Sequence, residues 1–558
     1  MAVSSTSLRA LHATLAVVLF TVTYAALSKP LIEFGDGRDY IIQTQAIVFD
    51  RQLAISPERR AEYWNSTSPF SAHLDPSRPS TATPSSTARG QIFGGAFGSL
   101  YYDAHGDLRY LHAWVYSLVV SPVYALLHLS GAPSVEYVAY RLVNIALLVT
   151  PILVLWRKRP TLSTLIGIVI FLASPITPYL QFAHAEIFCL SCVILSFLLI
   201  DRRGVGYLAP LFLGLGAAQN IPIALFFPLH LWLNTRCHPT SSPAQRPFEV
   251  AVRYACGIAL PLGMMFYNLL SFEALSPIAA FGHSDLRFVS LRRVFSFFFS
   301  PIVGAFWFLP ATWLAVLYAS VTGRARFVIP FMVSVLAVVS LTCATNNYYS
   351  AQLGVCRYAL WALAPLYALP FAASRSALGP PTLNLRGRLF LGVGFLLTSL
   401  IQVGMGSWRC AFGDWANFSP LQRATPEAAT LYSLTHLHDD IEPIVENLRR
   451  EEIGRSHQFL GCYAWNLGGD RSLLLVSRRT LVKPLDRIEV RASHDLRNEA
   501  GLTKVMHVVP IGPSRFGLSL RPDTAFHLHP FLGEYLLVWL SSSIKGIRSP
   551  SGEAVVFP

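Results

Sequence analysis

The chain has 558 residues, of which 53% are hydrophobic and only 13% are charged, with 44 Lys and Arg against 31 Asp and Glu. Soluble domains have roughly 25% charged residues, so this composition excludes a soluble enzyme, a disordered chain and a small disulfide-rich secreted module. It predicts an integral membrane protein. The positive charges lie in short clusters between apolar segments, which membrane orientation explains without a nucleic-acid partner.

The charges are unevenly distributed along the chain. Residues 1–407 contain 42 charged residues, whereas the 151 residues from 408 to 558 contain 33. We therefore expect a transmembrane domain over 1–407, followed by a water-facing domain over 408–558.

The first apolar stretch, residues 11–31, follows Arg9 and has no small-residue cleavage site, so we expect an uncleaved helix with a cytoplasmic N-terminus. The loop that follows, residues 33–136, is too long to be a simple connection and should lie outside. Residues 69–89 are rich in Ser, Thr and Pro and predict an irregular segment. Residues 114–129 are apolar but too short to span and contain Pro122, which favours a helix in the membrane interface.

Placing residues 114–129 on the surface has a consequence for the basic clusters. Every later cluster, beginning with Arg157, Lys158 and Arg159, then becomes cytoplasmic, as membrane topology normally requires. The prediction is mainly α: a bundle of eleven transmembrane helices with an external C-terminus. Its helices are 11–31, 140–156, 162–179, 185–200, 207–218, 221–233, 250–272, 303–321, 327–343, 358–373 and 389–405.

The last 151 residues contain short β-rich runs separated by Pro, Gly and Asp turns, at 473–477, 487–491, 503–509 and 535–540. After a helical stretch at 426–452, they predict a small, mostly β external domain. The eight cysteines form no CxxC pair and no zinc-type cluster, so they predict no metal site. Disulfides between Cys343 and Cys356, and between Cys410 and Cys462, remain open.

Polar residues gather at the predicted external ends of the helices, where each alone fits a membrane-interface residue. Acids, bases and several arginines at one level instead indicate a shared cavity, and arginine binds phosphate in a bidentate way. The residues are Asp36, Asp39, Arg141, His184, Glu186, Asn268, Arg287, Arg292, Arg293 and Arg357.

Several short motifs occur in this part of the chain. They are Gly35-Asp36-Gly37-Arg38-Asp39-Tyr40, Gly106-Asp107-Leu108-Arg109-Tyr110-Leu111-His112, Ser121-Pro122-Val123-Tyr124, Tyr140-Arg141-Leu142, His184-Ala185-Glu186-Ile187-Phe188, Ala218-Gln219-Asn220, Tyr267-Asn268, Leu291-Arg292-Arg293-Val294 with Phe299-Ser300-Pro301, and Gly354-Val355-Cys356-Arg357-Tyr358. In this order, over residues 11–370, they resemble polytopic GT-C-type glycosyltransferases, the relatives of protein O-mannosyltransferases and of the lipid A aminoarabinose transferase. No single motif is specific, and their order carries the resemblance.

The resemblance implies a catalytic carboxylate in the first external loop, a polyprenyl-phosphate sugar donor and inversion at the sugar carbon. Asp36 matches the loop acid, and Asp39 is the alternative because Gly37 stands where many members have a second acid. The implied roles of the other residues are donor-phosphate binding by Arg141, Arg357, Arg292 and Arg293, and sugar or acceptor binding by His112, His184, Glu186 and Asn268. His184 and Glu186 equally fit a helix start in which the acid stabilises the helix dipole.

Inverting transfer needs one base for the acceptor hydroxyl and cations for the leaving phosphate, so an Asp and two or three Arg suffice. A divalent cation is possible but not required, since Asp36, Asp39 and Glu186 offer enough oxygen ligands. The acceptor is an unknown lipid, glycan or protein of the cell envelope, and in a bacterium the site would face the periplasm.

Three other functions fit parts of the sequence. A transporter or lipid flippase predicts polar residues in the central thirds of helices and discontinuous helices; only the short pair around Asn220 and Pro222 favours it. An O-antigen polymerase or ligase would have its large catalytic loop late in the chain. In a non-catalytic assembly protein the external β domain would act, and intact site residues argue against this.

Overall fold

The structure is a computed structural model of the whole chain. It describes residues 5–28, 37–56, 58–59, 100–174, 176–200, 205–237, 246–280, 284–299, 304–321, 325–345, 356–372, 392–397 and 400, and a set of strands between 457 and 556. The chain divides into two compact units, one of Met1–Phe299 with Val303–Trp415 and one of Ser300–Ile302 with Ala416–Pro558.

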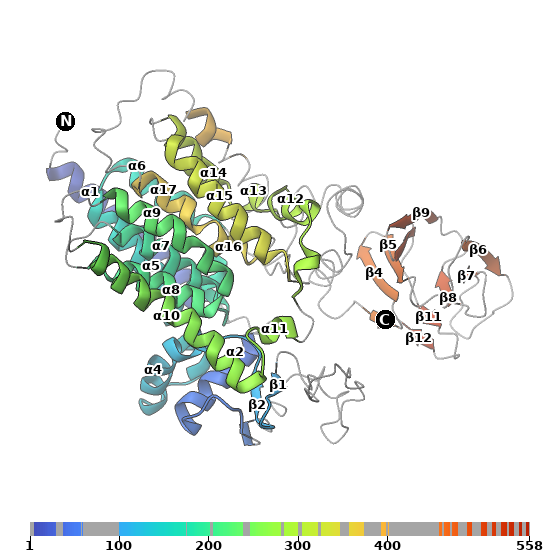
Figure 1. The fold of residues 1–558 in the computed structure, drawn as a ribbon. Coiled ribbons are helices and arrows are strands. Elements are labelled where there is room, and N and C mark those ends of the chain that lie inside the picture. Colours follow the sequence, from blue (N-terminus) through green and yellow to red (C-terminus); the bar gives the residue numbers. More distant parts are fainter. Residues whose placement is uncertain are drawn as a thin grey trace. The chain divides into compact units, whose positions relative to one another are not determined.

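The first unit is a bundle of helices (Figure 1), and the described part of the chain is mainly helical. Its helices are α1 Ser5–Ser28, α2 Gly37–Gln45, α4 Val115–Leu129, α5 Val135–Lys158, α6 Leu162–Leu172, α7 Glu186–Leu199, α8 Leu208–Gln219, α9 Phe227–Cys237, α10 Arg246–Phe272, α11 Pro277–Ala280, α12 Leu291–Phe299, α13 Ala305–Phe308, α14 Pro310–Ala319, α15 Ala325–Thr342, α16 Ala359–Ala362 and α17 Ala364–Ala372. Short 3-10 helices lie at Thr177–Gln181, Ile221–Phe226 and Leu286–Phe288, and a π-helix lies at Ala46–Asp50.

Three helices in the described part are long and apolar enough to cross a membrane: Ser7–Ser28, Val135–Lys158 and Phe248–Phe272. Helix α4 has 15 residues, fewer than the ~20 that a spanning helix needs. The eleven-helix topology and the interfacial position of α4 stay predictions.

Several helices that the sequence predicts as continuous are interrupted. The expected helix at 162–179 ends at Leu172, and a separate 3-10 helix begins at Thr177, with Pro178 as its second residue. The helix expected at 303–321 breaks before Pro310, because a proline ring clashes with the preceding turn of a helix. The helix expected at 358–373 is divided at Leu363. These boundaries of the sequence prediction were wrong.

Helix α7 forms the centre of the first unit. All of its residues are buried, and it packs against α5, α8, α16 and α17. Its sequence is apolar on every face apart from Glu186, Ser191 and Ser196, which is the pattern of a helix surrounded by other helices.

Two glycines bring α8 and α10 into close contact. A Cβ atom added to Gly214 would overlap the carbonyl group of Gly257, and one added to Gly257 would overlap the carbonyl of Pro210. Small residues at such crossings allow helix backbones to approach closely in membrane proteins.

A small hairpin belongs to the predicted external loop. Strands β1 (Leu100–Tyr102) and β2 (Leu108–Tyr110) pair antiparallel, and Gly106 has a φ of 85° in their connection. The Asp103 carboxylate accepts hydrogen bonds from the backbone N–H groups of His105 and Asp107 and so closes the turn. The Ala104 N–H donates to the Ser271 carbonyl, which anchors the hairpin to the end of α10.

The described strands of the second unit form two antiparallel sheets, ordered β3-β4-β5-β10-β9 and β12-β11-β8-β7-β6. The strands are β3 His457–Phe459, β4 Cys462–Gly468, β5 Arg471–Ser477, β6 Ile488–Ser493, β7 Lys504–Pro510, β8 Phe516–Leu520, β9 Phe526–Leu532, β10 Tyr535–Leu540, β11 Gly546–Arg548 and β12 Ala554–Val556. The predicted segments 69–89 and 426–452 lie outside the described residues. The external position of this unit stays a prediction.

Candidate functional site

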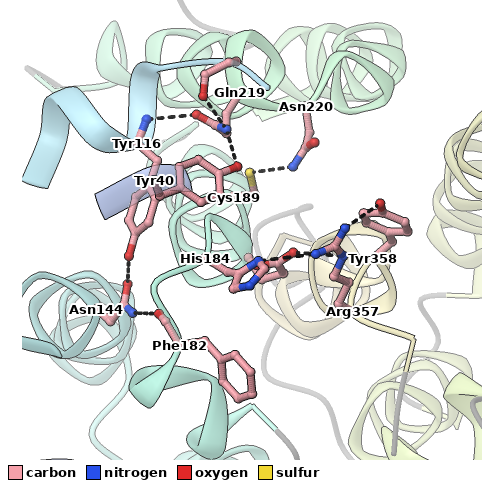
Figure 2. A network of polar contacts seen from close by, with 12 residues as sticks. Tyr40, Tyr116, Asn144, Phe182, His184, Cys189, Gln219, Asn220, Arg357 and Tyr358 are labelled. Carbon is pink, nitrogen blue, oxygen red and sulfur yellow. Dashed lines mark hydrogen bonds and ion pairs between the residues drawn. The ribbon is translucent and has the colours of Figure 1, made fainter. Parts of the chain in front are cut away.

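Three ionisable side chains meet inside the helical body, and we call them the charge cluster: His184, Glu186 and Arg357. Figure 2 shows His184 and Arg357 side by side. They are only 2%, 5% and 4% exposed. Arg357 Nη1 lies 3.3 Å from His184 Nδ1, and Arg357 Nε lies 3.6 Å from Glu186 Oε1. Glu186 Oε2 is 3.7 Å from His184 Nδ1. Buried charges are costly unless paired, so each member depends on the others.

Arg357 Nη1 and His184 Nδ1 are within hydrogen-bond distance of each other. A guanidinium group only donates hydrogen bonds, so in this contact His184 Nδ1 is the acceptor when the imidazole is neutral. Arg357 Nη2 also donates to the Tyr358 hydroxyl at 3.1 Å. The arginine is therefore held in a fixed orientation, with Glu186 as its anionic neighbour.

The chain holds His184 and Glu186 at the start of α7. Glu186 is the first residue of that helix, where a carboxylate interacts favourably with the helix dipole. The helix-start interpretation of Glu186 is therefore compatible with membership of the charge cluster. One carboxylate stabilises the helix and also faces Arg357.

The first turn of α2 packs against the charge cluster. A Cβ atom added to Gly37 would lie 3.5 Å from His184 Nε2 and 3.6 Å from the Ala183 Cβ, so this turn lies close to the histidine. Asp39 belongs to the same turn and is 3% exposed. Asp36 directly precedes Gly37 in the sequence but lies outside the described residues.

A chain of hydrogen bonds fixes the elements around the cluster (Figure 2). Gln219 donates to the Tyr40 hydroxyl at 3.0 Å and accepts from the Tyr116 N–H at 2.9 Å. The Tyr116 hydroxyl donates to Asn144 at 2.6 Å, and the Asn144 amide donates to the Phe182 carbonyl at 2.8 Å. Buried networks of this kind hold their members in one arrangement. This network joins α2, α4, α5, α8 and the segment that leads into α7.

Helix α2 is also bound to α5. The Tyr140 hydroxyl donates to the Tyr40 carbonyl at 2.7 Å and lies 2.6 Å from Thr44 Oγ1. Arg141, the next residue, points elsewhere: its Nη1 donates to the Leu27 carbonyl at 2.9 Å. Arg141 thus lies beside the end of α1, whereas Arg357 lies beside α7.

Arg293 lies at the end of α15. It is buried, and its Nη1 donates to the carbonyls of Cys343 at 3.2 Å and Thr345 at 3.3 Å. Carbonyls after the last turn of a helix lack intrahelical partners, so the arginine caps α15. The side chain of Arg292 lies outside the described residues.

The other two predicted sugar-binding residues are His112 and Asn268. The His112 ring is 5.0 Å from the ring of Tyr110, which is itself 5.0 Å from the Tyr40 ring. Asn268 lies in α10 and donates to the Leu275 carbonyl at 3.4 Å. The aromatic rings connect His112 with α2, while this hydrogen bond holds Asn268 to the segment after α10.

An ion pair that the sequence analysis did not anticipate holds the hairpin. Arg109 Nε donates to the buried Asp103 carboxylate at 2.5 Å, and Nη1 donates to the Tyr267 hydroxyl at 3.0 Å. Burial lowers the pKa of Arg109, but Tyr267 and Asp103 raise it, and the net pKa lies above the ordinary value. In the sequence, Asp103 and Arg109 on either side of Gly106 were the signal that could have indicated this ion pair.

Asn144 was also missed, because one amide in an apolar helix shows no local pattern.

Among the described residues, no group of three or more His, Cys, Asp or Glu could hold a metal ion. Cys343 and Cys356 are buried free thiols, and the side chains of Cys410 and Cys462 lie outside the described residues.

No protein-family model, no curated protein and no solved structure matches this chain. The similarity to GT-C-type glycosyltransferases therefore rests on the sequence motifs alone.

Proposed function

We propose that this chain is an integral membrane glycosyltransferase of the GT-C type. It would transfer a sugar from a polyprenyl-phosphate donor to an acceptor on the external face, with inversion at the sugar carbon. The observation that carries the proposal is the charge cluster of His184, Glu186 and Arg357, buried in an apolar helical body against the first turn of α2.

The proposed reaction uses these groups in separate roles. The carboxylate of Asp36, with Asp39 as the alternative, takes the proton of the acceptor hydroxyl while the hydroxyl oxygen attacks the sugar carbon. The bond between that carbon and the donor phosphate oxygen breaks, and the leaving polyprenyl phosphate keeps the electron pair. Arg357 neutralises this charge, and a fixed guanidinium in a site with little water is effective in that role.

Donor consumption tests the proposal directly. The purified chain is incubated with polyprenyl phosphates carrying either hexoses or pentoses, together with a membrane extract as the source of acceptor, and free polyprenyl phosphate is measured. We expect release from at least one donor by the wild type and none by Arg357→Ala. Equal release by both proteins would contradict the proposal.

One observation favours a second function, transport or lipid flipping. Helix α8 ends at Gln219, a 3-10 helix covers Ile221–Phe226, and α9 begins at Phe227. Discontinuous helices are typical of transporter binding sites, and Gln219 at this break belongs to the buried network. Uptake of labelled polyprenyl-phosphate sugar lipid across proteoliposome membranes, without any chemical change, would favour the transporter.

A further inference from the structure

A cavity of about 420 Å³ lies between α5, α6, α7, α14 and α17. Small-molecule sites in proteins have volumes of roughly 300–1,000 Å³, so it is large enough for a ligand. Most of its lining is aliphatic or aromatic, for example Ile152, Phe171, Ile194 and Leu314. Such a lining gives water few hydrogen-bond partners, so hydrocarbon is the favoured occupant.

The cavity is separate from the charge cluster. Residues of the C-terminal half of α5, around Leu155, line the cavity. Leu155 lies 11 residues, or about 16 Å of helix, beyond Asn144 of the buried network. On α7 it reaches Leu198, whereas Glu186 of the charge cluster is the first residue of that helix. The cavity and the charge cluster therefore lie at opposite ends of α7.

One rim of the cavity is polar and basic. Arg159 lines it together with Thr161, Ser163 and Thr164. Arg159 follows Arg157 and Lys158, which end α5. Among the described residues that line the cavity, none is acidic. The charge at the rim therefore complements an anion, and arginine and hydroxyl groups are the donors that phosphate prefers.

Gly167 offers a position at which the cavity can be tested. It lines the cavity and is exposed, and a Cβ atom added to it would meet no other atom within 4 Å. A large side chain can therefore be added at the lining without displacing the backbone.

We propose that this cavity holds an acyl chain of an anionic membrane phospholipid, whose phosphate is bound by Arg159 and the hydroxyls at the rim. Basic clusters beside transmembrane helices attract anionic lipids electrostatically. The apolar walls take the chain and the rim takes the head group, so the site distinguishes lipids by charge. The proposal does not depend on the reaction proposed above.

Native mass spectrometry of the full chain in detergent tests the proposal with phosphatidylglycerol and phosphatidylcholine as probes. We expect the wild type to bind phosphatidylglycerol roughly tenfold more tightly than phosphatidylcholine, the effect of one charge-assisted contact. Gly167→Trp should lose binding of both lipids, and Arg159→Gln should lose only the preference. If Gly167→Trp does not accumulate as folded protein, Gly167→Leu replaces it.

Two variants on α10 are matched controls. Gly263 also has open space around it, so Gly263→Trp adds the same bulk elsewhere. Arg253 is a partly exposed arginine paired with Glu249, so Arg253→Gln removes the same charge elsewhere. Both should bind phosphatidylglycerol as the wild type does. The proposal would be overturned if Gly167→Trp bound both lipids as the wild type does. It would also be overturned if Arg253→Gln lost the preference for phosphatidylglycerol as much as Arg159→Gln, or if equimolar polyprenyl phosphate displaced phosphatidylglycerol.

Discussion

Arg357 shows how much of a side chain's role depends on its neighbours. It is almost fully buried between His184 and Glu186. Arg293 is equally buried but donates to carbonyls at the end of α15, and Arg141 reaches the end of α1. The sequence analysis assigned the same role to all three arginines, whereas their contacts in the structure differ.

The first prediction concerns these arginines. Arg357→Ala should abolish polyprenyl-phosphate release, and Arg357→Lys should restore it only in part, because lysine lacks the planar fork that binds phosphate in a bidentate way. Arg141→Ala should also weaken donor binding if the sequence prediction for that residue is right. Donor binding is measured by native mass spectrometry, with Arg253→Gln as the control. Normal binding and activity in both alanine variants would leave these arginines with a structural role only.

The second prediction concerns Glu186. Glu186→Gln keeps the size of the side chain but removes the negative charge beside Arg357. Breaking a buried ion pair costs about 3–5 kcal/mol, so the thermal midpoint should fall clearly. The Glu249→Gln variant removes the acid of an exposed pair with Arg253 and should change the midpoint little. Equal midpoints for Glu186→Gln and Glu249→Gln would contradict the importance of the charge cluster for the fold.

At the scale of elements, the break between α8 and α9 and the close contact of α8 with α10 place Gln219 beside Tyr40 and Tyr116. Hydrophobic runs predicted where apolar helices lie, because burial in lipid or protein requires such runs. They did not predict where α13 gives way to α14 or α16 to α17, since the sequence stays apolar across both breaks, although Pro310 marks the first of them. Contacts across helices, such as that of Asn144 with Tyr116, have no local signal at all.

The third prediction tests the contact of α8 with α10. Gly214→Leu should lower the thermal midpoint or prevent accumulation, because the side chain would overlap the backbone of α10 at Gly257. Overpacking costs about 1–3 kcal/mol where the structure can adjust, and backbone adjusts little. Gly263→Leu is the control, since no atom lies within 4 Å of its added Cβ. Equal stability of the two variants would show that α8 and α10 do not cross at these glycines.

At the scale of the whole molecule, the distribution of Lys and Arg predicts that both the first long loop and the C-terminal unit are outside. Composition predicts a membrane protein, and three helices in the described part are long and apolar enough to cross a membrane. Composition does not give the number of membrane-spanning helices. Several apolar helices are shorter than a typical span, so their length does not show whether they cross the membrane or are buried in the protein.

The fourth prediction tests this topology. Cysteines introduced as Ser80→Cys and Ser542→Cys, in a background without accessible thiols, should both react with a membrane-impermeant maleimide added from the outside. Reaction at one position and not at the other would exclude the eleven-helix arrangement.

The central claim is that an acid of the first external loop is the catalytic base, and the activity of Asp36→Asn tests it most directly. The asparagine keeps the size of the side chain but cannot take a proton, so sugar transfer should fall by roughly two to four orders of magnitude while the amount of folded protein stays the same. Asp39→Asn is the paired variant, and a loss there instead would assign the base to the buried first turn of α2. Full transfer by both folded variants would contradict an inverting mechanism with a base in this loop.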